Sequence, residues 1–180
     1  MKYVITEQFS FRNKKFRITR NTKKLCKARV SQNKQYKDRY NIKLSNRMNR
    51  FIGGSTCFVE PDPKKPQSYL IYLRNDETKE KRLVSQFAYQ LSGHNNYLYT
   101  INIGNKLYSV QSCDLKYRRL AVIDTLPTTT STQYNCPETL FEVIDTFAKS
   151  NKEYHITIND GENQYSYLAV TILLHLHERQ

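Results

Sequence analysis

The side chains best suited to bind a ligand are basic and lie near the N-terminus. Several ammonium and guanidinium groups on neighbouring short strands could reach one phosphorylated ligand from one rim of the fold. Arginine can grip a phosphate with two donors, whereas lysine supplies a point charge. The predicted chemistry is therefore anion binding. Charge density selects the candidate residues, which are Lys14, Lys15, Arg17, Lys23, Lys24, Lys27 and Arg29.

The net charge of the 180-residue chain is +13, and it is unevenly distributed. Residues 1–60 contain sixteen Lys or Arg and three Asp or Glu, whereas residues 120–180 contain three and eight. Such an asymmetric field orients a protein toward polyanions, either lipid head groups or nucleic acid. The alternative is a positively charged face that only keeps the protein soluble.

A second basic stretch is interleaved with aromatic residues, a pattern that suits single-stranded nucleic acid because bases stack on aromatic rings while cations neutralise phosphates. No RNP-type motif accompanies it, and Tyr36 and Tyr40 are equally compatible with strand residues that pack inward. Nucleic-acid binding is therefore an alternative to lipid binding. Its residues would be Lys34, Lys37, Arg39, Lys43, Arg47 and Arg50 with Tyr36, Tyr40 and Phe51.

The sequence contains no established catalytic motif. It has no G-x-S-x-G elbow, no P-loop, no G-x-G-x-x-G turn and no H-E-x-x-H pair. His175 and His177 lie two positions apart at the end of a predicted helix, so they point to different faces and do not form a chelating i, i+4 pair. We interpret them as polar plugs. We expect a protein that is not an enzyme and that needs no metal and no cofactor.

The cysteines are dispersed along the chain, with no C-x-x-C pair and therefore no zinc-ligand spacing. Reduced, partly buried thiols are expected, and two long-range disulfides are the alternative for a secreted protein. The N-terminal segment lacks the long apolar run of a signal peptide, which favours a cytoplasmic location, with peripheral membrane association as an extension. The four cysteines are Cys26, Cys57, Cys113 and Cys136.

Residues 165–177 are predicted to form a helix with apolar side chains all around its axis. Such a helix has no polar face and must be buried. It would span about 20 Å, less than the ~30 Å of a bilayer core, so a transmembrane anchor is not expected. Asp160 and Glu162 are expected to cap its N-terminus. The simplest burial is inside a closed or nearly closed β-sheet.

Most of the remaining chain alternates apolar and polar residues at the period of a β-strand. Gly104 and Asn105 form a two-residue turn signature between two such strands. Thirteen segments fit this pattern, and we expect roughly ten to twelve of them to form short antiparallel strands before the terminal helix. The predicted strands cover residues 3–6, 9–11, 16–19, 25–30, 40–44, 55–59, 68–74, 82–91, 97–103, 106–111, 120–124, 140–147 and 153–158.

The two ends of the chain carry a recognisable pattern. Residues 3–18 place a strand ending in Phe9-Ser10-Phe11 before a strand with Phe16-Arg17-Ile18, and residues 147–176 place a last strand and a short polar turn before a wholly apolar helix. These patterns resemble the tubby C-terminal-like superfamily, which includes the LURP-one-related proteins and the phospholipid scramblases. The resemblance implies one domain over residues 1–180, mainly β, with a roughly twelve-stranded antiparallel barrel enclosing the C-terminal helix.

The same resemblance implies a function that faces lipid. Tubby members bind phosphoinositide head groups through cationic residues, and scramblases act on phospholipids. We therefore expect a binding module for anionic phospholipid or phosphoinositide head groups that uses the basic N-terminal residues. A protein-interaction barrel without a small ligand and a single-stranded nucleic-acid binding protein are the alternatives.

Overall fold

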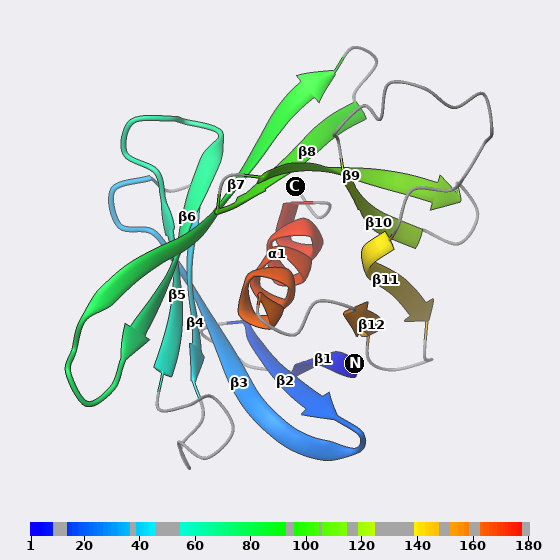
Figure 1. Ribbon diagram of the computed structural model, residues 1–180, viewed down its shortest axis with the longest axis horizontal. Helices are drawn as coiled ribbons and strands as arrows, with labels where there is room; N and C mark the ends of the chain where they lie inside the picture. Colours follow the sequence, from blue (N-terminus) through cyan, green and yellow to red (C-terminus); the bar gives the residue numbers. More distant parts are fainter. Residues whose placement is uncertain are drawn as a thin grey trace.

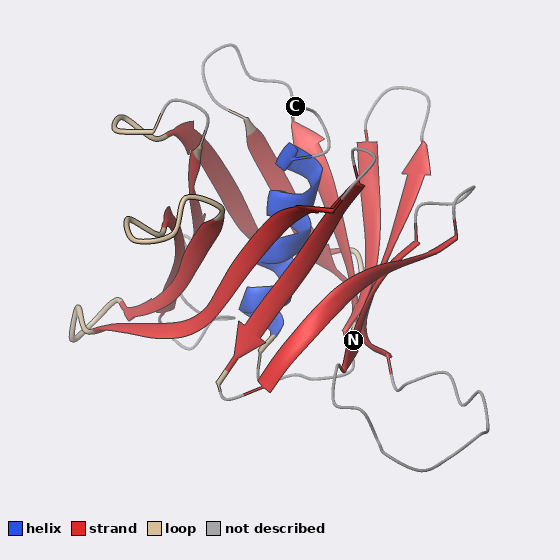
Figure 2. Ribbon diagram, turned by 90° about the horizontal axis from the view of Figure 1, so that it is seen from above, coloured by secondary structure: helices blue, strands red, loops and turns tan. Residues whose placement is uncertain are grey.

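A single antiparallel β-sheet surrounds one C-terminal helix in this computed structural model (Figures 1 and 2). The structure describes residues 1–8, 14–36, 39–45, 55–92, 96–104, 106–114, 119–124, 139–147, 152–158 and 163–177. Strand pairing follows chain order from β2 to β12, and β1 lies between β2 and β12, so the hydrogen-bonded ring closes there. The mainly β architecture predicted from the sequence, with an antiparallel sheet and a C-terminal helix, is confirmed.

Each element coincides with a segment of clear strand or helix periodicity. The strand predicted at residues 9–11 and the capping residues Asp160 and Glu162 lie outside the described residues. The strands are β1 (Lys2–Gln8), β2 (Lys15–Arg20), β3 (Lys23–Gln32), β4 (Tyr40–Ser45), β5 (Ser55–Pro61), β6 (Ser68–Asn75), β7 (Lys81–Ser92), β8 (Asn96–Ile103), β9 (Lys106–Asp114), β10 (Arg119–Asp124), β11 (Thr139–Phe147) and β12 (Lys152–Ile158), followed by helix α1 (Gln164–His177).

Period-two alternation separates the inner and outer surfaces of the sheet. In β2, Phe16 and Ile18 are buried while Lys15 and Arg17 are exposed. Successive side chains of a strand point to opposite faces, so the apolar set turns toward the helix and the basic set toward solvent. The sheet therefore contributes an apolar inner layer and a polar outer layer.

Helix α1 fills the space inside the sheet. Twelve of its fourteen residues, from Tyr165 to Leu176, are buried. Its first turn is held by polar contacts to the wall, because the Tyr3 hydroxyl donates to Gln164 Oε1 at 2.6 Å and the Ser85 and Ser166 hydroxyls lie 2.8 Å apart. The prediction that residues 165–177 form a buried helix is confirmed. None of the described helices is long and apolar enough to cross a membrane.

Two of the cysteines also belong to the core. Cys26 and Cys57 are free thiols, both are buried, and burial raises the pKa of each to about 12. This confirms the expectation of reduced, buried thiols for these two. Nothing is described for the side chains of Cys113 and Cys136.

The buried helix predicts a sharp response to charge. Leu173 is 2% exposed, so Leu173→Asp would bury a charge without a partner and should lower the free energy of unfolding by several kcal/mol. This is comparable with the total stability of an ordinary domain. Urea denaturation followed by circular dichroism measures the loss.

The matched control for this change is Leu107→Asp, because Leu107 lies on β9 with 53% of its surface exposed. Its expected effect is within about 0.5 kcal/mol. A Leu173→Asp protein as stable as the Leu107→Asp protein would contradict the enclosed position of α1.

Candidate functional site

The predicted basic residues lie on the outer wall of the sheet, along strands β2 and β3. Lys15 stands directly opposite Arg29, and Arg17 stands opposite Lys27. Lys14 immediately precedes β2, whereas Lys23 and Lys24 begin β3 at the other end of the hairpin. The expectation that all seven line one rim is therefore wrong. A hairpin keeps its two strands side by side, so charges near its turn and charges near its open end are separated by the strand length.

A β-bulge sets the outward direction of the basic side chains on β3. The register passes from Ile18↔Cys26 to Thr19↔Lys24, which leaves Leu25 as an extra residue. Leu25 and Cys26 are both buried as a result, while Lys24 and Lys27 are both exposed. Two residues opposing one is the defining geometry of a bulge, and it lets the chain change which residues face outward.

The basic surface extends onto β4, where sequence reasoning had assigned Lys43 to a different site. Lys43 pairs with Arg29, so Lys15, Arg29 and Lys43 form one cross-strand row. Directly opposite side chains on one face lie about 4.5–5.5 Å apart at Cβ. We define the basic face as five exposed cations on β2, β3 and β4 at and next to this row, namely Lys15, Arg17, Lys27, Arg29 and Lys43.

Negative charge is absent from the described parts of these strands. Residues 14–36 and 39–45 contain eleven Lys or Arg and no Asp or Glu. Lys15, Arg29 and Lys43 have no ion-pair partner among the residues that the structure describes. Like charges placed directly opposite on a sheet destabilise it. Repulsion within the row therefore lowers the stability of the folded protein, and a bound anion or added salt should relieve it.

Aromatic rings border the basic face on β5 and β6. Phe58 stands opposite Lys43 and Tyr72 stands opposite Phe58. The charged groups of Arg74, Lys43 and Lys81 lie 4.8, 5.5 and 5.9 Å from the centre of the Phe58 ring. Lys81 also lies 4.0 Å from the centre of the Tyr72 ring. The rings are thus engaged by cations of the same chain through cation–π contacts.

Arg39, a candidate for nucleic-acid contact, is a structural residue. It is 3% exposed, and its guanidinium donates to the carbonyl oxygens of Asp62 at 3.3 Å, Lys65 at 3.0 Å and Ser68 at 3.5 Å. It also lies over the ring of Tyr36, 5.2 Å from its centre. This contradicts its assignment to a nucleic-acid surface, because a buried guanidinium bonded to three carbonyls cannot reach a phosphate.

The other members of that alternative site are divided. Lys34 is exposed, Tyr36 and Tyr40 are half-buried, and Lys43 belongs to the basic face. The remaining four lie outside the described residues; they are Lys37, Arg47, Arg50 and Phe51.

The two histidines of α1 contact different walls, as their spacing predicts. His175 is 2% exposed; its Nδ1 contacts the Tyr154 hydroxyl, and its Nε2 lies 3.4 Å from Glu7 Oε2. His177 lies against the opposite wall, with Nδ1 3.3 Å from the Tyr99 hydroxyl and its ring centre 4.0 Å from that of Tyr89.

Glu7, His175 and Tyr154 place a carboxylate, an imidazole and a phenol next to one another, an arrangement that can relay a proton. The imidazole and the phenol are buried, however, so a substrate has little access to them. The edge of His175 packs on Phe16, with ring centres 5.3 Å apart. On the side of the helix end that carries His177, the cavity has a volume of only about 10 Å³, room for at most one water molecule. The arrangement serves as a polar plug at the end of the helix. Among the described residues, no three potential metal-ligating side chains gather at one point.

Comparison with known proteins identifies no relative: no protein-family model, no curated protein and no solved structure matches this chain.

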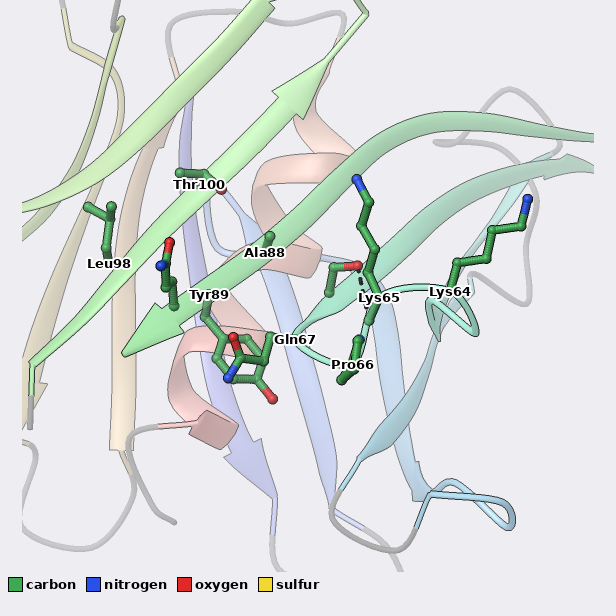
Figure 3. A pocket seen from close by; sticks show the side chains of 10 residues that line it. Lys64, Lys65, Pro66, Gln67, Ala88, Tyr89, Leu98 and Thr100 are labelled. Carbon is green, nitrogen blue, oxygen red and sulfur yellow. Dashed lines mark hydrogen bonds between the residues drawn. The ribbon is translucent and has the colours of Figure 1, made fainter. Parts of the chain in front are cut away.

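Sequence reasoning missed an open groove of about 460 Å³ on the outer wall. It lies between the β5–β6 loop, with Lys64 and Lys65, and the outward side chains of β7 and β8, including Leu98 (Figure 3). Leu98 occupies an outward position in a strand whose inward residues are Tyr99 and Ile101. Because Leu83 and Leu107 are exposed in the same way, an outward leucine by itself could not have located the groove from the sequence.

A substitution of Arg39 tests whether this residue holds the β5–β6 loop, which forms one wall of the groove. Arg39→Leu would remove the guanidinium donor from three carbonyl oxygens. Those of Lys65 and Ser68 keep backbone donors, from Ser68 and Asp62 respectively, and a hydrogen bond to a charged group contributes about 1.5–3 kcal/mol. We expect the free energy of unfolding to fall by about 2–4 kcal/mol in urea titrations. Arg29→Leu, at an exposed position, is the control and should change it by less than about 1 kcal/mol. Equal losses in the two variants would refute the structural role of Arg39.

His177 predicts a dependence of stability on pH. Burial lowers the pKa of His177 below its ordinary value, so the unfolded chain takes up a proton more readily than the folded one. As pH falls through the unfolded-state value of about 6.5, the free energy of unfolding should therefore decrease. His177→Gln should show a smaller decrease between pH 7.5 and 5.5. Parallel pH slopes in the two proteins would mean that His177 does not carry this effect.

Proposed function

We propose that this protein is a non-enzymatic module that binds anionic membrane surfaces through the basic face, recognising phospholipid or phosphoinositide head groups. The observation that carries the proposal is the row of Lys15, Arg29 and Lys43 across three adjacent strands, with no acidic residue in the described parts of those strands. Repulsion within this row costs stability. A surface of phosphate groups would neutralise these charges and relieve the repulsion. The row is therefore suited to an anionic partner.

The shape of the basic face supports a lipid surface over single-stranded nucleic acid. Its outward residues form part of a sheet wall, and the described outward positions of β2 and β3 carry no aromatic ring onto which a base could stack. The nearest rings, Phe58 and Tyr72, are already covered by cations of the chain. Stacking on bases needs an open ring face, whereas a bilayer surface needs only several cations within reach.

The resemblance of the chain ends to the tubby C-terminal-like superfamily supports the same proposal, since lipid head groups are the ligands of its tubby members. Peripheral attachment to the cytoplasmic side of a membrane would follow, because that leaflet carries the anionic lipids. The family membership itself stays a prediction.

Liposome co-sedimentation tests the proposal with a triple variant, Lys15→Glu, Arg29→Glu and Lys43→Glu. Each cation near an anionic membrane contributes about 1 kcal/mol, so loss of three should weaken binding to phosphatidylserine-containing vesicles by about 100-fold or more. Wild-type binding should increase with anionic lipid content and decrease as salt shortens the screening length of ~10 Å. Vesicles with phosphoinositide at equal total charge show whether the face prefers that head group.

The control is Lys2→Glu, Lys79→Glu and Lys106→Glu, three exposed positions outside the basic face. Both variants change the net charge equally, from +13 to +7, so a difference between them reports position. Equal weakening would reduce the effect to net charge and would refute a specific face. Displacement of the wild type from vesicles by low-micromolar single-stranded oligonucleotide would favour the nucleic-acid alternative.

A further inference from the structure

The groove on the outer wall joins an apolar floor to a pair of cations. Ala88 on β7 and Leu98 on β8 face outward into it, and Pro66 closes it from the β5–β6 loop. Leu98 is 47% exposed and contributes an aliphatic surface to the groove. Lys64 and Lys65 lie on the loop side, opposite Leu98 and Thr100 on the strand side (Figure 3).

Buried polar groups fix the loop that forms this wall of the groove. Arg39 bonds from below to the carbonyls of Asp62 and Lys65. The Asp62 carboxylate accepts from the Lys64 backbone N–H at 2.8 Å, the Ser68 hydroxyl at 3.2 Å and Gln86 Nε2 at 3.2 Å. The backbone that carries both lysines is therefore held in place before any ligand arrives, which reduces the entropy cost of binding.

The electrostatics of the groove select an anion. Among the residues that the structure describes, no acidic side chain lines it. The Asp62 carboxylate beneath the loop is 7% exposed and is engaged by its three donors. Neither Lys64 nor Lys65 has an ion-pair partner in the described part of the chain. A negative group at the loop side would therefore be attracted by the ammonium groups of these lysines, with no exposed carboxylate among the described lining residues to compete.

The strands beneath the groove exclude an extended peptide as a β-strand addition. β7 is hydrogen-bonded to β6 and β8, and β8 is bonded to β7 and β9. Strand addition requires a free sheet edge, and the groove offers none. A ligand in the groove would therefore contact the groove surface without extending the sheet.

We propose that this groove binds a single-chain anionic amphiphile, with its phosphate or carboxylate head at Lys64 and Lys65 and its aliphatic chain over Ala88 and Leu98. The volume of about 460 Å³ falls within the range of small-molecule sites. The groove is distinct from the basic face, so the inference does not depend on binding of that face to a bilayer. It assigns the groove to individual amphiphile molecules.

Isothermal titration calorimetry with monomeric dodecyl phosphate and dodecanoate, each below its micelle concentration, tests the inference. Dodecyl maltoside lacks the charge and inorganic phosphate lacks the chain. We expect at least one of the two anionic amphiphiles to bind at least tenfold more tightly than either of these, and the pair shows whether the head is a phosphate or a carboxylate. Absence of binding by both anionic amphiphiles, or equal binding of dodecyl maltoside or inorganic phosphate, would overturn the inference.

Two variants with matched controls locate the site. Leu98→Asn removes the apolar contact, and Lys64→Gln with Lys65→Gln removes the charge; each should weaken binding about tenfold. Leu107→Asn, at a similarly exposed leucine, and Lys23→Gln with Lys24→Gln, at exposed lysines, should stay within about twofold of the wild type. Thermal melting verifies that all four proteins are folded. If the control variants lose affinity as much as the groove variants, the amphiphile binds nonspecifically and the assignment is wrong.

Discussion

Burial of a helix with no polar face is the constraint on which the rest of this structure depends. Residues from Tyr165 to Leu176 are all buried, so apolar side chains must surround α1 on every side. A ring of strands supplies them, because alternation turns every second residue inward. The described inner surface is correspondingly apolar, from Tyr3 and Ile5 on β1 to Ile156 and Ile158 on β12. Once the inside is assigned in this way, most polar and charged strand residues face solvent, and the few buried ones, such as Ser68 and Ser85, are hydrogen-bonded.

The outer wall is therefore where ligand chemistry can reside. On β2, β3 and β4 it concentrates cations in register, and on β5 and β6 it continues with Phe58 and Tyr72 under further cations. The alternating pattern requires only that the outward-facing positions of these strands be polar. Threonine or mixed charges would satisfy the fold at lower electrostatic cost. The selection of one sign of charge across three strands is what directs attention to an anionic partner.

The buried polar side chains of Arg39, Asp62 and His175 each make contacts that stabilise the fold. Arg39 joins the segment before β4 to the β5–β6 loop through three carbonyl oxygens. Asp62 organises the same loop from within, and His175 occupies the end of the helix between Glu7, Phe16 and Tyr154. Buried polar groups are costly unless they are satisfied. Here their bonds fix loops whose outer surfaces, such as the one that carries Lys64 and Lys65, remain available to solvent.

Sequence by itself determined the elements and their inner faces. The period-two pattern located the strands, and the Gly104 turn, with its φ of +61°, joins β8 to β9 as expected. The unbroken apolarity of residues 165–177 required burial of the helix. These are local properties, because they depend on residue type and on spacing along the chain and not on which other segments lie beside them in the fold.

Tertiary structure alone decided which charges act together. Arg39 and Lys43 lie four residues apart in one basic stretch, yet Arg39 is buried under the β5–β6 loop and Lys43 stands beside Arg29 on the outer wall. The bulge at Leu25 reversed the facing of part of β3, and the groove between Lys65 and Leu98 joins residues more than thirty positions apart. Strand register and loop packing set these outcomes through contacts distant in sequence. A one-residue shift in register sends a side chain to the opposite face, and composition does not encode that shift.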